Sequence, residues 1–371
     1  MEAKRPVVAV VRSDRRRAAV AESLALISDD VRRVVQPSVL LKPNCVSHVR
    51  QLPSTHADAF SATLDALFAA GAKSVTVAEG ASDAPAAFER FGLIREALGR
   101  PVRFMDLNRD ESEWDELDLR AVDGSSMRAR LSRTVASAEC RVSLALMKTH
   151  VSSMVTFSLK NMLSSLHPQD RVMMHDYAGG GNGYSGWRRL IVEFLKGDNP
   201  LVNALTRSMG RIKSLVRRPL EYDRLSLADK RFLKSVVALN ANLAALAVRT
   251  RPHLSVIDGF DAMHREGPRH GTPIRLGLAI AGTDPVAVDS VATALMGFDP
   301  KDVGYLQMAE SLGVGTADLD RIEVVGDPIA KVGRLCVAHS NAAIARFWRE
   351  PTGSRTIPRP HLQSTEKASR R

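Results

Sequence analysis

The chain has 371 residues and a formal net charge of +11, and 44% of its residues are hydrophobic. This length allows one large or two ordinary domains, and the composition is typical of a soluble globular protein. No apolar run approaches the roughly 18–20 residues expected of a membrane-spanning helix. The charged N-terminus lacks the apolar segment of a signal peptide, so the sequence predicts a cytoplasmic protein.

The positive charge is concentrated in two segments. Residues 187–240 contain 12 Lys or Arg and 5 Asp or Glu, and residues 351–371 contain 5 and 1. These segments carry the whole positive excess, so the rest of the chain is neutral. A basic groove across the core is not implied, and we expect no nucleic-acid partner.

The three cysteines, Cys45, Cys140 and Cys336, lie far apart and form neither a C-x-x-C motif nor a zinc spacing. A cysteine-bound iron–sulfur cluster usually takes four thiolates, so we expect none to be held by this chain alone. A disulfide framework is also not expected in a reducing compartment. The identity of any other cofactor or metal stays open.

Short apolar segments alternate with segments of helical periodicity in the first part of the chain. Strands are predicted at 7–12, 38–44, 74–80, 101–107 and 141–150, and helices at 15–34, 56–72 and 84–98. This alternation is typical of parallel β–α–β units. The predicted fold class is therefore α/β, with a mostly parallel β-sheet and helices on both of its faces.

The pattern breaks at residues 167–248, where a Gly-rich loop precedes a largely helical, basic segment. It returns with strands predicted at 253–263, 274–284 and 321–327 and helices at 285–297 and 302–313. The sequence thus predicts one α/β domain over residues 1–350, with two halves at about 1–165 and 250–330 and a helical insertion between them. Residues 351–371 are rich in Pro, Ser, Thr and Arg and are predicted to be a disordered tail.

The basic segment 187–240 has three possible roles. Apolar residues recur at helical spacing against a basic face, as in helices that lie on a membrane surface or pack on a partner. An ordinary helix on its own core with a solvated basic face gives the same pattern. The sequence leaves these alternatives open.

Polar side chains follow several predicted strands at the point where each strand ends. In open α/β sheets ligands bind at the carboxyl ends of the strands, so these residues are candidates for a binding site. The predicted substrate- or cofactor-binding residues are Lys42, Asn44, Glu79, Lys160, Asn161, Asp258 and Asp289.

The stretch around Lys148 points to an anionic ligand. Lys148 and His150 lie two residues apart on a strand and therefore face the same side, and Lys160 and Asn161 follow at a predicted helix start. Lysines supply point charges and an amide supplies an orienting donor, which suits a small anion. The alternative is a pair of surface lysines beside a core histidine.

The stretch 256–271 places carboxylates and imidazoles on a Gly-rich loop. Such groups can act as acid and base or bind a divalent metal. We therefore take Glu266 as a candidate catalytic residue beside Lys148 and His150, and His264 and His270 as candidate metal ligands. The alternative is a tight turn that joins two strands. Asp289 lies inside the predicted helix 285–297. It either binds a ligand or is a carboxylate that the helix dipole alone favours at this position.

Seven segments together resemble the domain-of-unknown-function family 362. They are "LLKPNCV" (40–46), "GAKSVTVAEG" (71–80), "LMKTH" (146–150), "TFSLKNMLSSL" (156–166), "VIDGFDAMHREGPRHGTP" (256–273), "AGTDPVAVDSVATALMGFDP" (281–300) and "IEVVGD" (322–327). Some members of that family carry a ferredoxin-like module with iron–sulfur clusters, and the resemblance therefore implies redox chemistry. This chain lacks the cysteines of that module.

Two functions follow from these observations. The first is an enzyme that binds a small anionic substrate or cofactor at the carboxyl ends of the strands, with an oxidoreductase as the reaction class that the resemblance implies. The second is a non-catalytic binding or assembly protein that docks on a membrane surface or a partner through residues 187–240. The substrate, the reaction and the oligomeric state are not determined by the sequence.

Overall fold

The structure is a computed structural model that describes residues 5–110, 112–174, 208 and 222–349. Within these residues nine strands form one sheet of order β11-β1-β10-β9-β7-β2-β3-β4, and β8 pairs with β7. Most of the basic segment 187–240 and the whole tail 351–371 lie outside the described residues. The strands of the sheet are β1 (Val7–Arg12), β2 (Ser38–Lys42), β3 (Ser74–Glu79), β4 (Val102–Asp106), β7 (Cys140–His150), β8 (Met154–Thr156), β9 (Leu254–His264), β10 (Thr272–Gly282) and β11 (Glu323–Gly326).

The sheet is mostly parallel. The pairs β1–β11, β9–β7, β7–β2, β2–β3 and β3–β4 are parallel, whereas β1–β10, β10–β9 and β7–β8 are antiparallel. Apolar side chains alternate along the strands and bury into two separate cores, one on each face. The predicted α/β fold class is confirmed.

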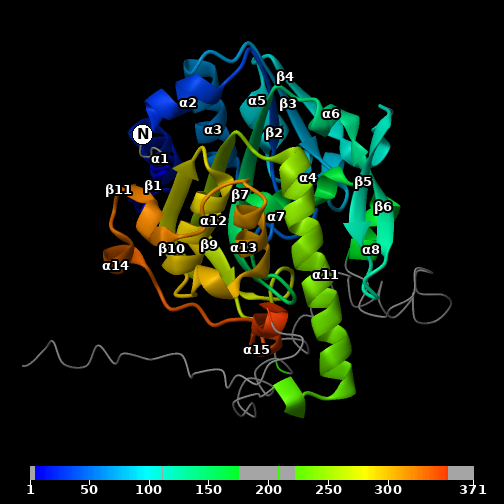
Figure 1. The fold of residues 1–371 in the computed structure, drawn as a ribbon. Helices are drawn as coiled ribbons and strands as arrows, with labels where there is room; N and C mark the ends of the chain where they lie inside the picture. The colour runs from blue at the N-terminus through cyan, green and yellow to red at the C-terminus, as the bar shows by residue number, and fades with distance from the viewer. Residues whose placement is uncertain (1–4, 111, 175–207, 209–221, 350–371) are drawn as a thin grey trace, which may run out of the picture.

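Helices cover both faces of the sheet (Figure 1). One core lies under α1 (Arg16–Leu26), α2 (Ser28–Val34), α3 (Ala57–Ala69), α4 (Ala84–Arg90) and α5 (Leu93–Ala97). The other lies under α7 (Ser158–Asn161), α11 (Leu227–Thr250), α12 (Pro285–Leu295) and α13 (Gly304–Ser311). Shorter helices are α6 (Arg133–Ala136), α8 (Pro168–Met174), α14 (Ile329–Val332) and α15 (Ala342–Ala345).

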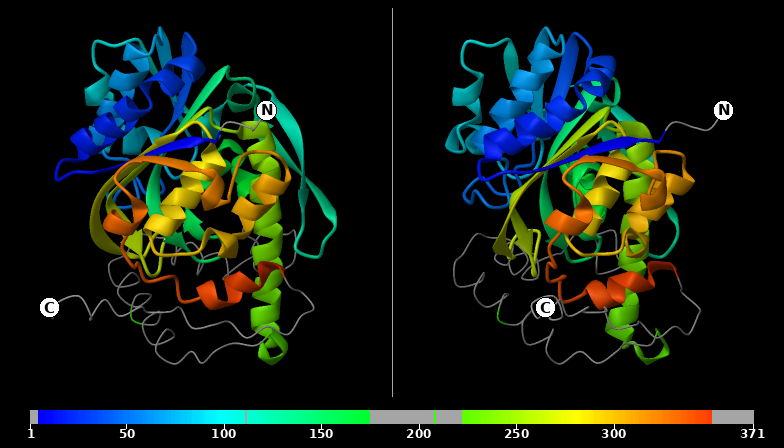
Figure 2. Two further views of the ribbon diagram at one scale, coloured as in Figure 1. Left: turned by 60° about the vertical axis from the view of Figure 1, so that its left-hand side comes forward. Right: turned by 90° about the vertical axis from the view of Figure 1, so that its left-hand side faces the viewer.

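The first strand lies among the last ones. Val8 of β1 pairs with Gly282 of β10, and Val10 pairs with Gly326 of β11. Figure 2 shows this blue strand beside the yellow and orange segments of the chain. The two predicted halves therefore share one continuous sheet.

A hairpin that the sequence analysis did not predict packs beside the main sheet. It consists of β5 (Trp114–Arg120) and β6 (Ser126–Ser132), which pair with each other in an antiparallel register. Leu117 and Leu131 are buried, and the backbone of Arg120 exchanges two hydrogen bonds with the Asn242 side chain of α11. The hairpin thereby extends the core that α11 covers.

Helix α11 is a core helix, although its length and mean hydropathy of 1.3 also satisfy the criteria for crossing a membrane. About 61% of the most apolar stretch of this helix is buried inside the protein. Buried residues such as Leu239 and Leu243 belong to the same apolar core as residues of the sheet, and α11 packs against α13 and β5. The expectation that no segment is long and apolar enough to span a membrane was wrong for α11, but its burial explains the composition.

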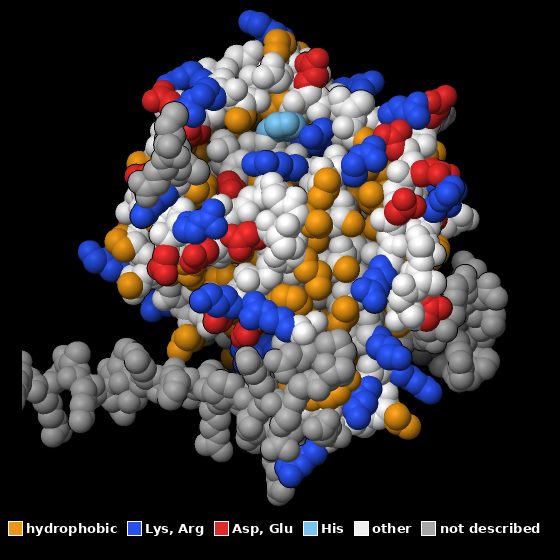
Figure 3. Space-filling view, in the orientation of Figure 1, with side chains coloured by type: hydrophobic (Ala, Val, Ile, Leu, Met, Phe, Trp, Pro, Cys, Tyr) orange, Lys and Arg blue, Asp and Glu red, His pale blue; other side chains and the backbone are white. Residues whose placement is uncertain are grey.

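The surface shown in Figure 3 mixes both signs of charge. Blue Lys and Arg side chains alternate with red Asp and Glu side chains over this face. Several form exposed ion pairs, among them Arg128–Glu116 at 2.9 Å. Exposed pairs of this kind contribute little to stability.

The direction in which successive strands are added to the sheet reverses between β2 and β7. After β2 the chain adds β3 and β4 on one side, and it then returns to place β7 and β9 on the other side of β2. At such a switch point the connections diverge and leave room outside the carboxyl ends of the strands. This is where a ligand site is expected in an α/β sheet.

The burial of α11 predicts the effect of truncating its side chains. Leu239→Ala removes a side chain that is 1% exposed and should lower the free energy of unfolding by about 2–5 kcal/mol. Val248→Ala, on a side chain that is 52% exposed, should change it by less than about 0.5 kcal/mol. Urea denaturation of both variants measures the difference. Equal, small effects would show that α11 does not belong to the core.

Candidate functional site

A buried ion pair joins the ends of β2 and β3. Lys42 Nζ donates to Glu79 Oε1 at 2.7 Å, and both side chains are 0% exposed. Two apolar strands deliver these groups to the same edge because β2 and β3 are parallel neighbours. A buried charge needs a partner and further hydrogen bonds, so this pair must be well satisfied.

Glu79 receives donors from three parts of the chain. Its carboxylate accepts from Cys45 N at 2.8 Å, from Ala81 N at 2.9 Å and from Ser164 Oγ at 2.5 Å. Burial alone would raise the pKa of Glu79, but the Lys42 ammonium and these donors hold the pKa below its ordinary value. The predicted ligand-binding carboxylate is thus a fully bonded anchor in this structure.

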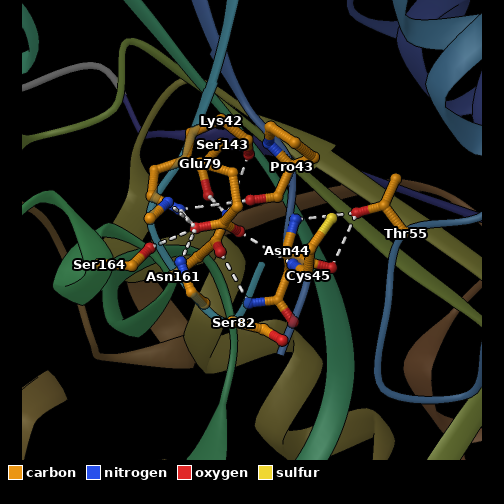
Figure 4. Close-up of polar contacts among 12 residues, drawn as sticks. Lys42, Pro43, Asn44, Cys45, Thr55, Glu79, Ser82, Ser143, Asn161 and Ser164 are labelled. Atoms are coloured by element: carbon orange, nitrogen blue, oxygen red, sulfur yellow. Dashed lines mark hydrogen bonds and ion pairs between the residues drawn. The ribbon is translucent and has the colours of Figure 1, made fainter. Parts of the chain in front are cut away.

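Asn44 links the anchor to β7 and α7. Its Nδ2 donates to Asn161 Oδ1 at 2.8 Å, and its Oδ1 accepts from Lys148 Nζ. Asn161 Nδ2 in turn donates to the Lys42 carbonyl and to Ser143 Oγ, both at 3.0 Å. Figure 4 shows how Lys42, Asn44 and Asn161 point toward one another beside Glu79. The structure therefore brings together six of the predicted residues: Lys42, Asn44, Glu79, Lys148, Lys160 and Asn161.

Two of the lysines have strongly lowered pKa values. Burial lowers the pKa of Lys148 to about 7, with nearby Arg269 and Lys160 adding to the effect and Glu79 opposing it. Burial also lowers the pKa of Lys160 to about 7. Lys148 is 1% exposed and Lys160 is 6% exposed, which excludes the alternative of surface lysines.

Asp289 of α12 contacts the start of α7. Its two oxygens accept from Ser158 N at 2.9 Å and Leu159 N at 3.1 Å, and Tyr305 contributes a longer contact of 3.4 Å. Burial raises the pKa of Asp289 to about 8 in spite of these donors. Asp289 therefore holds the start of the helix that carries Lys160 and Asn161.

The other two predicted catalytic residues have different surroundings, a turn for His150 and the C-terminal segment for Glu266. His150 Nδ1 accepts from Ser152 N and Ser153 N at the turn between β7 and β8. Glu266 is held by His339, whose Nε2 lies 2.9 Å from Oε2, and by Ser340. Glu266 thus binds the C-terminal segment instead of the lysine cluster, a partnership that no local sequence signal indicated.

Asp258, His264 and His270 each bond to residues outside the cluster. Asp258 pairs with Arg16 of α1 at 3.2 Å. His264 Nδ1 accepts from Val337 N at 3.3 Å, and His270 N donates to the Glu266 carbonyl. In the described part of the chain, no three His, Cys, Asp or Glu residues come together as a metal site. His264 and His270 therefore belong to no such group there.

Sequence reasoning missed three groups that complete the cluster. Ser143, Ser164 and the Pro53 carbonyl, which accepts from Lys148 Nζ at 3.2 Å, all bond to its members. Ser143 was detectable as a hydroxyl within the apolar strand "RVSLALM". Ser164 and Pro53 gave no signal, because their roles depend on contacts with residues distant along the chain.

The geometry is that of an α/β protein with a buried polar cluster at the switch point of its sheet. Residues 39–294, more than half of the chain, match the family described as "Domain of unknown function (DUF362)". The chain belongs to that family, as the seven sequence segments predicted.

Two individual proteins are also similar to this chain. The thylakoid-associated protein sll1697 of Synechocystis is 36% identical over 109 residues, which cover 29% of this chain and 30% of that protein. The lactate racemase apoprotein of Thermoanaerobacterium thermosaccharolyticum has a TM-score of 0.41 and 11% identity, over 83% of this chain and 57% of the racemase chain. The match thus spans about a third of the thylakoid-associated protein and just over half of the racemase chain.

The buried ion pair predicts a large effect for a conservative substitution. Glu79→Gln leaves the Lys42 ammonium buried without its counter-charge, so the free energy of unfolding should fall by about 3–5 kcal/mol. The matched control Glu116→Gln breaks the exposed pair with Arg128 and should cost less than about 1 kcal/mol. Chemical denaturation compares the two. A Glu79→Gln protein as stable as the control would contradict the assignment of Glu79 as an anchor.

Proposed function

We propose that this protein is an enzyme that binds a small anionic substrate or cofactor beside Lys148 and Lys160, at the switch point of the sheet. The observation that carries the proposal is a group of three buried lysines with one buried carboxylate, in which Lys42 pairs with Glu79, and Lys148 lies within electrostatic reach of both Glu79 and Lys160. Glu79 compensates Lys42, with which it makes the direct pair. The positive charge of Lys148 and Lys160 therefore exceeds what Glu79 neutralises.

The excess charge explains why an anion would bind. A buried ammonium is costly, so each lysine releases its proton near neutral pH when no anion is close. An anionic ligand would favour the charged forms and would be attracted strongly in this low-dielectric setting. The amides of Asn44 and Asn161 are already oriented by hydrogen bonds and keep the cluster in place.

The same property suits proton transfer. A group with a pKa of about 7 exchanges protons at neutral pH, which is the condition for an effective acid or base. Lys148 is therefore the residue we assign to proton transfer, with Lys160 as the second cation. The oxidoreductase class implied by the family resemblance remains a prediction, as do the catalytic roles of His150 and Glu266.

The proposal predicts a pH-dependent affinity for sulfate, a probe that keeps its charge between pH 5 and 9. Lys148 and Lys160 are charged below about pH 7 and neutral above it, so sulfate binding should weaken as the pH rises through 7. Lys148→Met should weaken binding at pH 6 by about tenfold or more, equivalent to about 1.4 kcal/mol. Isothermal titration calorimetry measures both effects.

The matched control is Lys331→Met, because Lys331 is exposed and lies on α14. It should bind sulfate as the unmodified protein does. Circular dichroism must show that Lys148→Met is folded, since the substitution leaves Asn44 Oδ1 and the Pro53 carbonyl without this donor. A folded Lys148→Met protein with unchanged affinity would place the anion site elsewhere.

The second candidate function is docking on a membrane surface through residues 187–240, favoured by the similarity to a thylakoid-associated protein. It predicts that the full chain co-sediments with vesicles of anionic phospholipid. Replacing Arg217 and Arg218 by Ser should reduce that binding, by about 1 kcal/mol for each charge. If the unmodified protein and the variant co-sediment with the vesicles to the same extent, this role is contradicted. A cytoplasmic location is compatible with either candidate and remains a prediction.

A further inference from the structure

A serine and a histidine lie together where two neighbouring loops meet. Ser82 belongs to the turn between β3 and α4, and His48 belongs to the loop after β2. His48 Nδ1 lies 2.8 Å from Ser82 Oγ, which is the distance of a hydrogen bond. Because β2 and β3 are parallel neighbours, the two loops leave the sheet at the same edge. Both residues are half-buried, so neither is sealed inside the core.

The backbone of Ser82 adopts a conformation that residues other than glycine rarely take. Its φ is 58°, in the left-handed region. Such strain persists only where the surrounding structure enforces it, and it is concentrated at functional sites. Asn108 Nδ2 donates to the Ser82 carbonyl at 3.2 Å, which holds one side of the turn. Glu79 holds the other side by accepting from Gly80 N at 2.6 Å and from Ala81 N at 2.9 Å.

The sequence of this turn, "GASDA" (80–84), places small residues on both sides of the serine. A Cβ on Gly80 would overlap the Ser164 carbonyl oxygen, and Ala84 is 0% exposed, so larger side chains would be crowded at both positions. A strand, a tight turn with serine between small residues, and a helix form the arrangement of a nucleophile elbow, which presents a serine hydroxyl above the end of a strand. Alanine stands here where that motif has its second glycine.

The loop that carries His48 is fixed by its own hydrogen bonds. Ser47 Oγ accepts from Val49 N at 3.1 Å and from Arg50 N at 3.0 Å, so this hydroxyl closes the turn around the histidine. Ser54 Oγ donates to the Ser47 carbonyl at 2.6 Å and ties the two ends of the loop together. The contact between the imidazole and the serine hydroxyl therefore joins two turns that are each held in place, as a catalytic pair requires.

We propose that Ser82 and His48 are the nucleophile and the base of a hydrolase of small carboxylic esters. This activity goes beyond the anion binding proposed above and does not depend on it. In the tautomer with the proton on Nε2, His48 Nδ1 accepts from Ser82 Oγ and makes this oxygen more nucleophilic. Among the described residues no carboxylate pairs with His48, so the imidazolium formed in the reaction is stabilised less than in a full triad. This favours esters, whose leaving oxygen departs more readily than an amine.

The reaction takes two steps. In the first, Ser82 Oγ bonds to the ester carbonyl carbon and its proton passes to His48 Nδ1. The bond from that carbon to the leaving oxygen then breaks, and the proton goes to this oxygen, which gives an alcohol and an acylated serine. In the second, a water molecule bonds to the acyl carbon, its proton passes through Nδ1 to Ser82 Oγ, and the carboxylic acid leaves. Asp83 N is the candidate donor to the oxyanion, because it follows the nucleophile and donates to none of the residues that the structure describes.

Labelling with diisopropyl fluorophosphate tests the proposal on the full chain. Ser82 Oγ displaces fluoride from phosphorus, so peptide mass spectrometry should find the phosphoryl adduct on Ser82 of the unmodified protein. His48→Gln keeps a hydrogen-bond acceptor but cannot take up the proton, so it should slow the labelling by about tenfold or more. Ser125→Ala is the matched control. Ser125 is exposed in the turn between β5 and β6, and its loss should leave the labelling unchanged.

Hydrolysis of p-nitrophenyl acetate supplies the second measurement. The unmodified protein should release p-nitrophenolate over many turnovers, and Ser82→Ala should lower kcat/KM by about a hundredfold or more. Circular dichroism must show that the variants are folded. Labelling of the unmodified protein needs no variant and decides the question even if they are not. The proposal is overturned if no adduct forms on Ser82, if a folded His48→Gln protein is labelled at the same rate, or if a folded Ser82→Ala protein hydrolyses the ester as before.

Discussion

The buried pair of Lys42 and Glu79 is the constraint on which the site depends. Two charges with no exposure are tolerated only if their remaining donors and acceptors are also satisfied. Glu79 meets this requirement by accepting from the backbone of the loops after β2 and β3 and from Ser164. The ends of two strands and the segment after α7 are consequently fixed around one carboxylate. Asn44 and Asn161 meet because their backbones are held in this way.

The lysine cluster and a neighbouring cavity of about 360 Å³, lined in part by Arg16 and Asp258, differ in their charged groups, although one loop separates them. Pro53 accepts from Lys148, while Leu52 and Ser54, on either side of it, line the cavity. The cluster gathers three lysines beside one carboxylate, whereas the charged lining of the cavity is one arginine and two aspartates, Arg16, Asp258 and Asp261.

The strands of the main sheet were predictable because they are short, apolar and separated by helical segments. The grouping of Lys42, Asn44 and Lys148 was predictable for the same reason, since parallel strands end at one edge. The hairpin β5–β6 was missed, although "WDELDLR" alternates and "DG" marks a turn, because its strands are largely polar. The partnership of Glu266 with His339 could not be predicted, since such contacts depend on tertiary packing and leave no periodic pattern.

The placement of β1 between β10 and β11 has a consequence for folding during synthesis. Val8 and Val10 find their partners only at Gly282 and Gly326, so both edges of this strand stay unpaired until most of the chain has left the ribosome. Contacts so distant along the chain close slowly and raise the contact order. An apolar strand with two open edges is also a template for pairing with other chains. The N-terminal strand of the nascent protein therefore stays unpaired through most of synthesis.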